Sequence, residues 1–513
     1  MATWTDGYVS DIQYTAGFYR EMTPAHLGYV CRTLGVRPPD FSKPFTYCEL
    51  GCGQGLGTSL MAAAYPQGDF YGVDFNPGQI ANALALATDA GLTNMHFVED
   101  SFTTMVSNPN VSYPMFDVIA LHGIYSWVSA ENRLAIVKVI ERFLKPGGIV
   151  YVSYNAMPGW TAMLPFQRLV REHAKRNPAR SDQQFAKAFD FITKLKDANG
   201  IFFAMNPTVA ARMDIISKVS NNYLPHEYLN GAWNPMFVTD VADEMEQARL
   251  SFLGSATISD NIPVANITSS IEPLYNSATD PLMKELVKDF AVNQSFRRDI
   301  YIRGATQMTQ GELKETLGQQ YFVLTMPREN IELKFKTALG DAEGDPNIYN
   351  PILDALAEGP KTFLELNQIE AFSAKEKAGL AQAIGFLCAS CVVGPSSSKS
   401  THDFEAAKAF NKLVAKRASQ GAPYEFLCAP QIGSGIVAHT HDLAVLPLVM
   451  EDPEIGADKL AAEAWSVMTS LGQSVTIDGK QATKMEDAIE ALVHYMVNFK
   501  EIRIPYWRSL GVI

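Results

Sequence analysis

The 513-residue sequence lacks three features, and each absence excludes a class of protein. No apolar run reaches the roughly 18 residues that a membrane-spanning helix needs. The six cysteines are too few for a disulfide framework in a chain of this length. No basic residue precedes Arg20, whereas a secretory signal peptide begins with a charged region. We therefore expect a cytoplasmic protein with no membrane span.

Positive charge is also scarce. The chain has 42 Lys and Arg against 55 Asp and Glu, a formal net charge of −13. Nucleic-acid binding needs basic surface to neutralise phosphates, so we expect no nucleic-acid partner. Hydrophobic residues make up 47% and charged residues 19%, which is ordinary globular composition. At about 150 residues per domain, the length corresponds to about three domains.

Residues 45–155 alternate between short apolar strands and helical stretches, a pattern typical of a parallel, doubly wound α/β sheet. The predicted strands are Phe45–Leu50, Phe70–Val73, Met95–Val98, Val118–Leu121 and Ile149–Tyr154, and the predicted helices are Thr58–Tyr65, Gln79–Ala90 and Arg133–Leu144. The fold class predicted is therefore α/β with a Rossmann-like sheet, followed by mixed α+β and helical domains.

Shifts in composition divide the chain into six segments. They are an N-terminal helical segment (1–43), the α/β domain with the candidate site (44–165), a helical connector (166–220), a mixed domain (221–340), a winged-helix-like module (341–440) and a C-terminal helical region (441–513).

A glycine-rich loop follows the first predicted strand. It reads Glu-x-Gly-x-Gly-x-Gly, with Glu49, Gly51, Gly53 and Gly55. Glycines permit a tight turn and close approach of a ligand to the backbone. The dinucleotide fingerprint would need a glycine at Leu56, and no lysine follows the loop as a P-loop requires. The loop thus suits a nucleotide-containing ligand of another kind.

Charge around the loop favours a cationic ligand. Residues 44–132 contain eight Asp or Glu and no Lys or Arg. Pyrophosphate would normally meet positive charge, whereas S-adenosyl-L-methionine is net cationic and suits an acidic site. Asp74 ends the second strand, where a carboxylate can accept both ribose hydroxyls. Asp100 follows the third strand, where it can accept from an adenine amino group while Phe102 packs nearby.

As a set, these residues resemble the class I S-adenosylmethionine-dependent methyltransferases. Glu49–Gly55 resembles their first motif, Asp74 their ribose-binding acid and Asp100 their adenine-side acid. Phe116–Ile119 and Lys145–Gly148 resemble their fourth strand and the turn before the fifth. The resemblance implies S-adenosyl-L-methionine as cofactor. The predicted contacts are Tyr14, Tyr19, Glu49, Gly51, Gly53, Gly55, Asp74, Phe75, Asp100, Ser101, Phe102 and His122.

A closer resemblance extends beyond the α/β domain. Asp11–Pro24, Leu121–Val128 and Ser153–Trp160 are similar to bacterial methyltransferases with a methyltransferase regulatory domain, and His226–Ile258 is similar to that domain itself. Methyltransferases acting on lysines of rickettsial outer-membrane proteins share this architecture. The resemblance implies a homodimer and a protein substrate, such as an outer-membrane or surface protein, although a small-molecule acceptor stays open.

Methyl transfer from a sulfonium is an in-line displacement, so the protein mainly positions donor and acceptor. A lysine acceptor must also be neutral, although its pKa is about 10.4 in water. We expect an apolar, aromatic pocket where strands four and five end. Its predicted catalytic residues are His122, Tyr125, Trp127 and Tyr154, with Asn155 and Trp160 beside them. Each of these aromatic side chains could equally belong to the packed core. His122 could be a structural residue or a general base.

Two further patterns are weaker. Cys388, Cys391, Cys428, His439 and His441 include ligand types for zinc, but a second close cysteine pair is missing, so no metal site is predicted. The winged-helix-like module fits a protein contact or dimer interface better than DNA, given the net charge. Two alternatives to a protein-lysine methyltransferase remain open. The acceptor could be a small metabolite or a saccharide precursor, or the fold could serve as a non-catalytic cofactor-binding scaffold.

Overall fold

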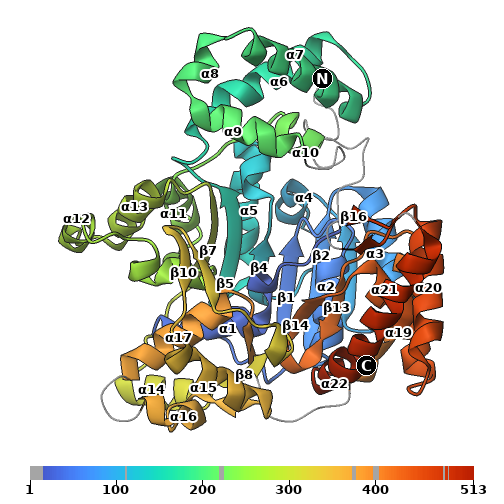
Figure 1. The fold of residues 1–513 in the computed structure, drawn as a ribbon. Helices are drawn as coiled ribbons and strands as arrows, with labels where there is room; N and C mark the ends of the chain where they lie inside the picture. Colours follow the sequence, from blue (N-terminus) through green and yellow to red (C-terminus); the bar gives the residue numbers. More distant parts are fainter. Residues whose placement is uncertain are drawn as a thin grey trace.

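A seven-stranded sheet lies at the centre of the computed structural model, which describes residues 16–109, 112–218, 224–372, 377–396, 404–477, 480–482 and 484–513 (Figure 1). Its strands are β1 (Phe45–Leu50), β2 (Gly68–Asp74), β3 (Met95–Glu99), β4 (Phe116–Leu121), β5 (Leu144–Asn155), β6 (Ser251–Ser255) and β7 (Phe296–Ile302). The order is β3-β2-β1-β4-β5-β7-β6. Strands β1 to β5 are parallel, and β7 runs antiparallel to β5 and β6. The predicted Rossmann-like class is confirmed.

The sheet extends beyond the segment predicted to contain it. Strands β6 and β7 come from the predicted 221–340 domain, not from 44–165. β7 pairs with the whole second half of β5, from Ile149 to Asn155. The α/β unit and the mixed domain therefore share one sheet.

Alternate residues of the strands face two separate cores, because successive side chains of a strand point to opposite faces. The first core holds Val118, Ala120, Ile149, Tyr151 and Ile300. The second holds Ile119, Leu121, Val150, Val152, Tyr154 and Tyr301. Both faces are buried, which explains why these strands read as continuous apolar runs.

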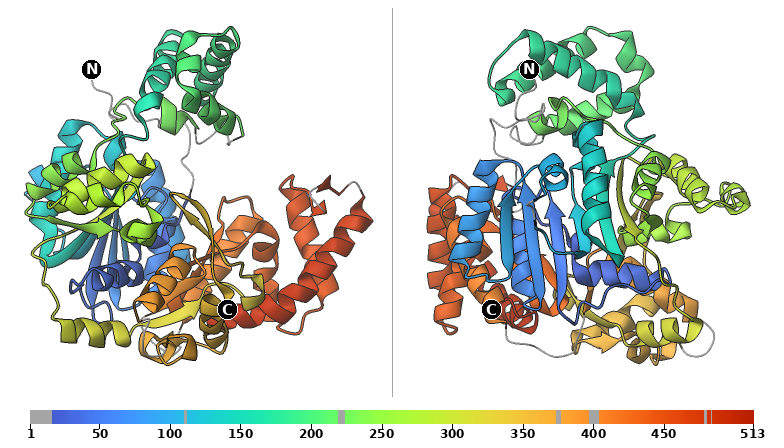
Figure 2. Two further views of the ribbon diagram at one scale, coloured as in Figure 1. Left: turned by 60° about the vertical axis from the view of Figure 1, so that its left-hand side comes forward. Right: turned by 180° about the vertical axis from the view of Figure 1, so that it is seen from behind.

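Helices cover both faces (Figure 2). The first core includes side chains of α1 (Pro24–Thr33), α2 (Leu56–Ala64) and α3 (Pro77–Asp89). The second includes side chains of α4 (Phe102–Ser107), α5 (Ala130–Phe143) and α11 (Val238–Glu246). Capping side chains fix the N-termini of two of these helices. The Asn76 side chain accepts from Gly78 N and Gln79 N at the start of α3, and the Ser129 side chain caps α5.

A small helical unit stands at one end of the molecule, with its own hydrophobic core (Figure 1). It comprises α6 (Leu164–Arg176), α7 (Ser181–Asp197), α8 (Ile201–Met205), α9 (Pro207–Ile216) and α10 (Leu224–Tyr228). Helices α12 (Glu272–Ser277) and α13 (Pro281–Val292) form a separate projection on the β7 side of the sheet.

The next segment forms a second, small sheet with order β11-β8-β12. Its elements are α14 (Gln310–Gly318), β8 (Tyr321–Leu324), β9 (Lys334–Thr337), β10 (Gly340–Glu343), α15 (Pro346–Ala357), β11 (Lys361–Thr362), α16 (Phe363–Leu366), α17 (Lys377–Ala389) and β12 (Val393–Ser396). Because the central strand β8 precedes residue 341, this unit begins earlier than the predicted 341–440 module.

The C-terminal region (residues 405–513) is mostly helical and includes the end of the segment predicted as a winged-helix-like module (341–440). It contains α18 (Glu405–Ser419), β13 (Phe426–Ala429), β14 (Ser434–Val437), α19 (Thr440–Glu451), α20 (Ala457–Ser470), β15 (Thr476–Ile477), β16 (Lys480–Gln481), α21 (Met485–Asn498), a π-helical turn at Phe499–Arg503 and α22 (Ile504–Ser509). Among the described residues, no helix is both long and apolar enough to cross a bilayer.

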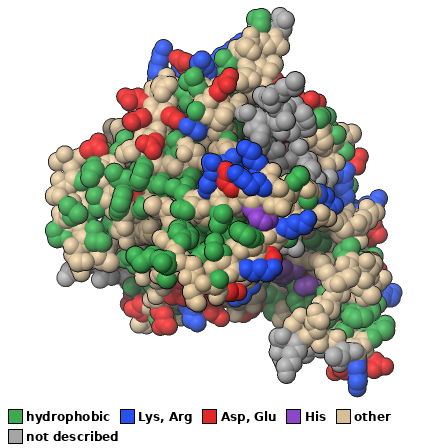
Figure 3. All heavy atoms as spheres, turned by 90° about the horizontal axis from the view of Figure 1, so that it is seen from above, with side chains coloured by type: hydrophobic (Ala, Val, Ile, Leu, Met, Phe, Trp, Pro, Cys, Tyr) green, Lys and Arg blue, Asp and Glu red, His purple; other side chains and the backbone are tan. Residues whose placement is uncertain are grey.

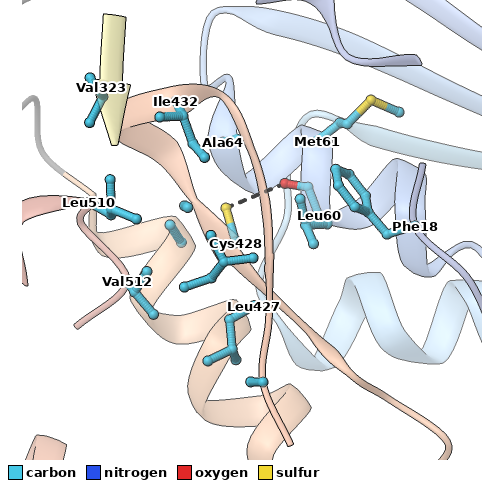
Figure 4. Packing of buried hydrophobic residues seen from close by; sticks show 14 of the residues in the cluster. Phe18, Leu60, Met61, Ala64, Val323, Leu427, Cys428, Ile432, Leu510 and Val512 are labelled. Atoms are coloured by element: carbon cyan, nitrogen blue, oxygen red, sulfur yellow. Dashed lines mark hydrogen bonds between the residues drawn. The ribbon is translucent and has the colours of Figure 1, made fainter. Parts of the chain in front are cut away.

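The C-terminal region packs directly on α2 (Figure 4). The Cys428 thiol donates to the Leu60 carbonyl over 3.5 Å, and the Tyr65 hydroxyl donates to the Gly433 carbonyl over 2.9 Å. Phe18, Leu60 and Leu427 belong to one continuous buried cluster. The chain that follows residue 404 therefore completes the core beneath the helix that the glycine-rich loop opens.

Candidate active site

The glycine-rich loop connects β1 to α2 through three left-handed residues. Gly51, Gly53 and Gly55 have φ values of +76°, +54° and +72°, which favour glycine. A Cβ on Gly55 would lie 2.4 Å from the Phe97 ring, so this glycine is needed for packing. A Cβ on Gly53 would meet only the Gln79 Oε1 atom, at 3.7 Å. Gly53 therefore presents open backbone to a ligand.

Asp74, at the end of β2, holds this loop in place. Its Oδ2 accepts from Gly53 N over 3.0 Å, and its Oδ1 accepts from Asn76 N over 2.9 Å. Burial raises the pKa of Asp74, against the lowering effect of these amides. The backbone amide of Phe75 also donates to this carboxylate. A carboxylate has about four acceptor sites, so the predicted ribose contact remains compatible with the geometry.

Glu49 adds a second carboxylate at the end of β1, and its side chain accepts from the Thr58 hydroxyl. Burial raises the pKa of Glu49 to about 7, with a smaller contribution from the nearby charge of Asp74. A buried and a partly buried carboxylate next to an open backbone favour a ligand that brings positive charge.

Asp100 follows β3 next to Asp74, whose carbonyl accepts from Asp100 N over 3.1 Å. Its carboxylate accepts from the Tyr113 hydroxyl over 3.1 Å and from Ser101 N over 2.9 Å. The Ser101 side chain caps α4 through Thr104 N. Phe75 and Phe102 are half-buried beside these strand ends. The predicted adenosine contacts thus converge at one edge of the sheet, as parallel strands require.

His122 and Tyr19 form a stacked pair across from the loop. Their ring centroids are 3.4 Å apart with an interplanar angle of 22°. His122 Nδ1 lies 2.8 Å from the Tyr151 hydroxyl. Burial, helped by the charge of Arg298, lowers the pKa of His122 to about 3. His122 is consequently neutral at physiological pH and a weak base. Tyr14, the other predicted N-terminal contact, lies outside the described residues.

A cavity of about 70 Å³ lies between the N-terminal segment and the loop. It is lined by residues 16–19, Met22, Glu49, residues 51–57, Met61 and His122. Neither lysine nor arginine is among these described lining residues, in agreement with the expected cationic ligand. The cavity accommodates only part of a cofactor, whose remainder would lie along the strand ends at Asp74 and Asp100.

The predicted acceptor aromatics do not gather in one pocket. Tyr154 is buried in the second core, where its hydroxyl donates to Asp299 Oδ2 over 2.5 Å. Tyr125 is also fully buried there, and its hydroxyl donates to Glu244 of α11. These two side chains lie on the face opposite Tyr151 and His122.

Trp127 occupies a third location, below the helical unit. It stacks on Trp233 at 6.0 Å, and Trp233 contacts Trp160 edge-on at 5.2 Å. The Trp160 indole donates to the Ser295 carbonyl over 2.6 Å. Neither of the two cavities described here is lined by Tyr125, Trp127, Tyr154 or Trp160. Of the four predicted catalytic residues, only His122 reaches the cofactor cavity.

A second, larger cavity of about 770 Å³ adjoins the first and shares Phe18 and Tyr19 with it. Its walls come from the N-terminal segment, β7, residues 325–330, the end of α17, the β13–β14 hairpin and the C-terminal helices. Aromatic side chains lining it are Phe18, Tyr19, Phe426, Tyr495, Phe499, Tyr506 and Trp507, and charged ones are Arg20, Glu21, Arg298 and Arg503.

Sequence reasoning missed most of this cavity, because its walls are distant in the chain. One signal was available: Arg297 and Arg298 stand together within the otherwise apolar strand β7. Because side chains alternate, one arginine of such a pair must face each side of the sheet. Arg297 is buried among carboxylates, whereas Arg298 lines the larger cavity.

The weak zinc pattern is not assembled. Cys428 is buried against α2, while Cys391 is exposed and Cys388 buried at the end of α17. His439 and His441 contact each other at a centroid distance of 5.6 Å. Across the described ranges, no group of three or more His, Cys, Asp or Glu could hold a metal ion.

Comparisons with known proteins identify the family of the chain. A methyltransferase domain family matches residues 42–221, and the predicted methyltransferase regulatory domain family matches residues 220–303. Protein sll1526 of Synechocystis sp. is 35% identical over 512 residues, which are 99% of this chain and 100% of that protein. The chain belongs to this family of methyltransferases with a regulatory domain. Protein RP789 of Rickettsia prowazekii is 26% identical to the present chain, over 56% of this chain and 51% of RP789.

The solved structure of PKMT2 from Rickettsia typhi in complex with AdoHcy is similar over the whole length. It covers 97% of this chain and 99% of that chain, with a TM-score of 0.71 and 20% sequence identity. The likeness shows that the fold is shared from the N-terminal segment to the C-terminal helices. AdoHcy is the form that S-adenosylmethionine takes after it has given up its methyl group.

S-Adenosylmethionine is the cofactor of this methyltransferase, and the residues present fit it. Gly53 would offer its open backbone, Asp74 and Asp100 would offer carboxylates to the ribose and the adenine, and Glu49 would offer a carboxylate to the cationic end. When bound, the cofactor supplies a methyl group on a sulfonium, a leaving group that needs no acid. The chain's own residues would bind and orient it. Tyr19 lines both cavities and stacks on His122, which lines the smaller one.

Proposed function

We propose that this S-adenosylmethionine-dependent methyltransferase methylates lysine side chains of a protein substrate, and that the acceptor enters the larger cavity. One observation carries the proposal. The cavity of about 770 Å³ meets the cofactor cavity at Phe18 and Tyr19 and is walled by aromatic side chains. Aromatic faces stabilise an ammonium or a methylated ammonium by roughly 0.5–2 kcal/mol each. The full-length likeness to PKMT2 supports the same class of acceptor.

The experiment is a transfer assay with radiolabelled S-adenosylmethionine and cell extract, separated into protein and small-molecule fractions. We expect label in protein, with methylated lysine identified by peptide mapping. A lysine must be neutral to react, so transfer should rise with pH from about 7 towards 9–10. Because the pKa of His122 is lowered to about 3, no step near its ordinary value of 6.5 is expected.

The alternatives predict other outcomes. Label found only in the metabolite fraction or on oxygen would contradict the lysine acceptor and support a small metabolite or saccharide precursor. Cofactor binding without any transfer would support a scaffold. The intact loop with Asp74 and Asp100 favours an active enzyme.

The sequence-based expectation of a homodimer is kept as part of this proposal. Exposed apolar side chains gather on the side of the molecule where α12 and α13 lie (Figure 3). Leu274, Met283 and Phe290 are 61%, 48% and 60% exposed. Large exposed apolar patches commonly mark contacts between proteins. Charge-introducing changes there should shift the mass in solution from dimer to monomer, and an unchanged mass would contradict this surface. The cytoplasmic location and an outer-membrane or surface protein as partner remain predictions.

A further inference from the structure

A loose ion pair lines the larger cavity directly beside Tyr19. Glu21 Oε1 lies 4.0 Å from Arg298 Nε, and the two side chains are only 16% and 27% exposed. Glu21 belongs to a short 3-10 turn, Arg20–Met22, that follows Tyr19. Arg298 extends from β7 on the face that holds Tyr151 and Ile300. The pair therefore stands where the acceptor cavity meets the cofactor cavity.

Neither partner of this pair has saturated hydrogen bonds. Arg298 Nη1 donates to Thr257 Oγ1 over 3.3 Å, but Arg298 Nε is buried with no acceptor within the described part of the chain. The Glu21 carboxylate accepts no hydrogen bond from a side chain of another described residue. Buried polar atoms normally find partners, so the unpaired Arg298 Nε in this half-buried pair needs an explanation.

The other charged groups of this cavity are already engaged. Arg20 donates to the Cys388 and Ala389 carbonyls over 2.7 and 2.8 Å, at the end of α17. Arg503 donates to the Tyr495 hydroxyl over 3.0 Å and lies 3.3 Å from Asp442. Glu21 is consequently the carboxylate of this cavity that remains available to bind a ligand.

Glu21 carries its negative charge in this position. Burial alone would raise the pKa of Glu21, but Arg298, His26 and Arg20 outweigh it and hold that pKa below its ordinary value. An ionised carboxylate beside an aromatic ring attracts an amine through both its charge and its hydrogen bonds. The same cavity contains no aspartate or lysine among its described lining residues.

We infer that Glu21 binds the acceptor's amine and positions its nitrogen beside Tyr19 for methyl transfer, and that Arg298 orients the Glu21 carboxylate. This inference rests on the proposed amine acceptor. The ammonium first releases a proton to water. The lone pair of the neutral amine then forms the N–CH3 bond, while the S–CH3 bond breaks and leaves a thioether. The methylated ammonium can afterwards release its extra proton to water. Glu21 accepts an N–H hydrogen bond throughout and exchanges no atom.

The first test compares Glu21→Gln with the full-length wild-type enzyme. We expect KM for the acceptor to rise about tenfold or more, because a charge-assisted hydrogen bond is lost. The Kd for S-adenosylmethionine should stay within about twofold, since Glu21 does not line the cofactor cavity. Glu21→Asp should restore part of the loss. The matched control is Glu425→Gln, an exposed residue next to the cavity-lining Phe426. An unchanged KM in Glu21→Gln would overturn the inference.

A second test separates this inference from the identity of the acceptor. The probes are n-butylammonium and 1-butanol, which have similar size, added to the enzyme with S-adenosylhomocysteine and followed by calorimetry. We expect the wild type to prefer n-butylammonium, and Glu21→Gln to lose about tenfold of that preference. Equal affinities in both proteins would overturn the role of Glu21, even where lysine is methylated. A retained preference without any lysine product would contradict the lysine acceptor and leave Glu21 as an amine site.

Discussion

Asp74 fixes the glycine-rich loop through its carboxylate, and we predict that the same carboxylate also contacts the ribose. It accepts from the backbone amides of Gly53 and Asn76, so it helps to shape the surface that the cofactor meets. The sequence alone suggested only the ribose contact. Replacing Asp74 should therefore lower the cofactor affinity in two ways: a hydrogen bond to the ribose is lost, and the glycine-rich loop becomes less ordered.

We predict that Asp74→Ala weakens S-adenosylmethionine binding by about 1.5–3 kcal/mol, the usual value of hydrogen bonds to a charged group. Gly53→Val should abolish binding, because its backbone is left-handed and its open side is the ligand side. Calorimetry measures both. Asp69→Ala is the control, as Asp69 lies at the other end of β2 and pairs with His96. Equal affinity in Asp74→Ala and the control would show that the cofactor binds elsewhere.

We predict that Glu49 makes the affinity for S-adenosylmethionine depend on pH. The pKa of Glu49 is about 7 in the cofactor-free protein, and a bound cation favours the ionised form. Below pH 7 the carboxyl must lose a proton on binding, so affinity should fall by up to about tenfold per pH unit and level off above about pH 8. Glu49→Gln should flatten this dependence. Calorimetry in buffers of different ionisation enthalpy would detect the released proton. A flat profile in the wild type would contradict the prediction.

The convergence of the candidate cofactor-site residues at one edge of the sheet could be predicted, because each residue belongs to a local signal. Gly51 to Gly55 follow a strand directly, and Asp74 and Asp100 end strands whose carboxyl ends must share one edge of the sheet. Tyr154 could not be assigned to a face without the register of β5. Its even position places it in the second core, whereas a one-residue shift would have put it beside His122.

Among the elements, most predicted strands and helices of residues 45–155 are found within a few residues of their expected ends. β1 occupies Phe45–Leu50 as predicted, whereas β5 begins at Leu144 and so includes Lys145–Gly148, where a turn was expected. β6 and β7 were not identified, because they begin 96 and 141 positions after the end of β5 at Asn155. Pairing across such a separation depends on tertiary packing, which local periodicity does not report.

The side-chain alternation of β5 and β7 gives a prediction for Tyr154. Its hydroxyl bonds Asp299, which also holds Arg297, so the three groups form a buried network on the second face. Tyr154→Phe should lower the free energy of unfolding by about 1–3 kcal/mol, because Asp299 loses a donor. Cofactor affinity should not change. Thermal unfolding measures the change in stability, and calorimetry measures the affinity for the cofactor. Tyr151→Phe, on the first face of the sheet, is the comparison. A loss of cofactor affinity in Tyr154→Phe would place that side chain in the active site.

At the scale of the molecule, the C-terminal region serves both core and cavity. β13 and β14 pack on α2, and Phe18 contacts Phe426 at a centroid distance of 5.6 Å. The same region supplies Tyr495, Arg503 and Trp507 to the larger cavity. The cofactor site and the proposed acceptor site are therefore built on one continuous core, with no independent domain carrying either of them.

This continuity predicts how truncated chains behave. A fragment ending near Pro165 would lose β7, so the backbone of β5 from Ile149 to Asn155 would form an exposed edge, and we expect it to aggregate. A fragment ending after Arg303 keeps all seven strands but uncovers α2 and Phe18. It should remain folded only marginally, bind S-adenosylmethionine more weakly than the full chain, and transfer no methyl group. We would measure the solubility, thermal stability, cofactor affinity and methyl transfer of both fragments. Full transfer by the second fragment would show that the acceptor does not need the C-terminal walls, and would contradict the proposed acceptor cavity.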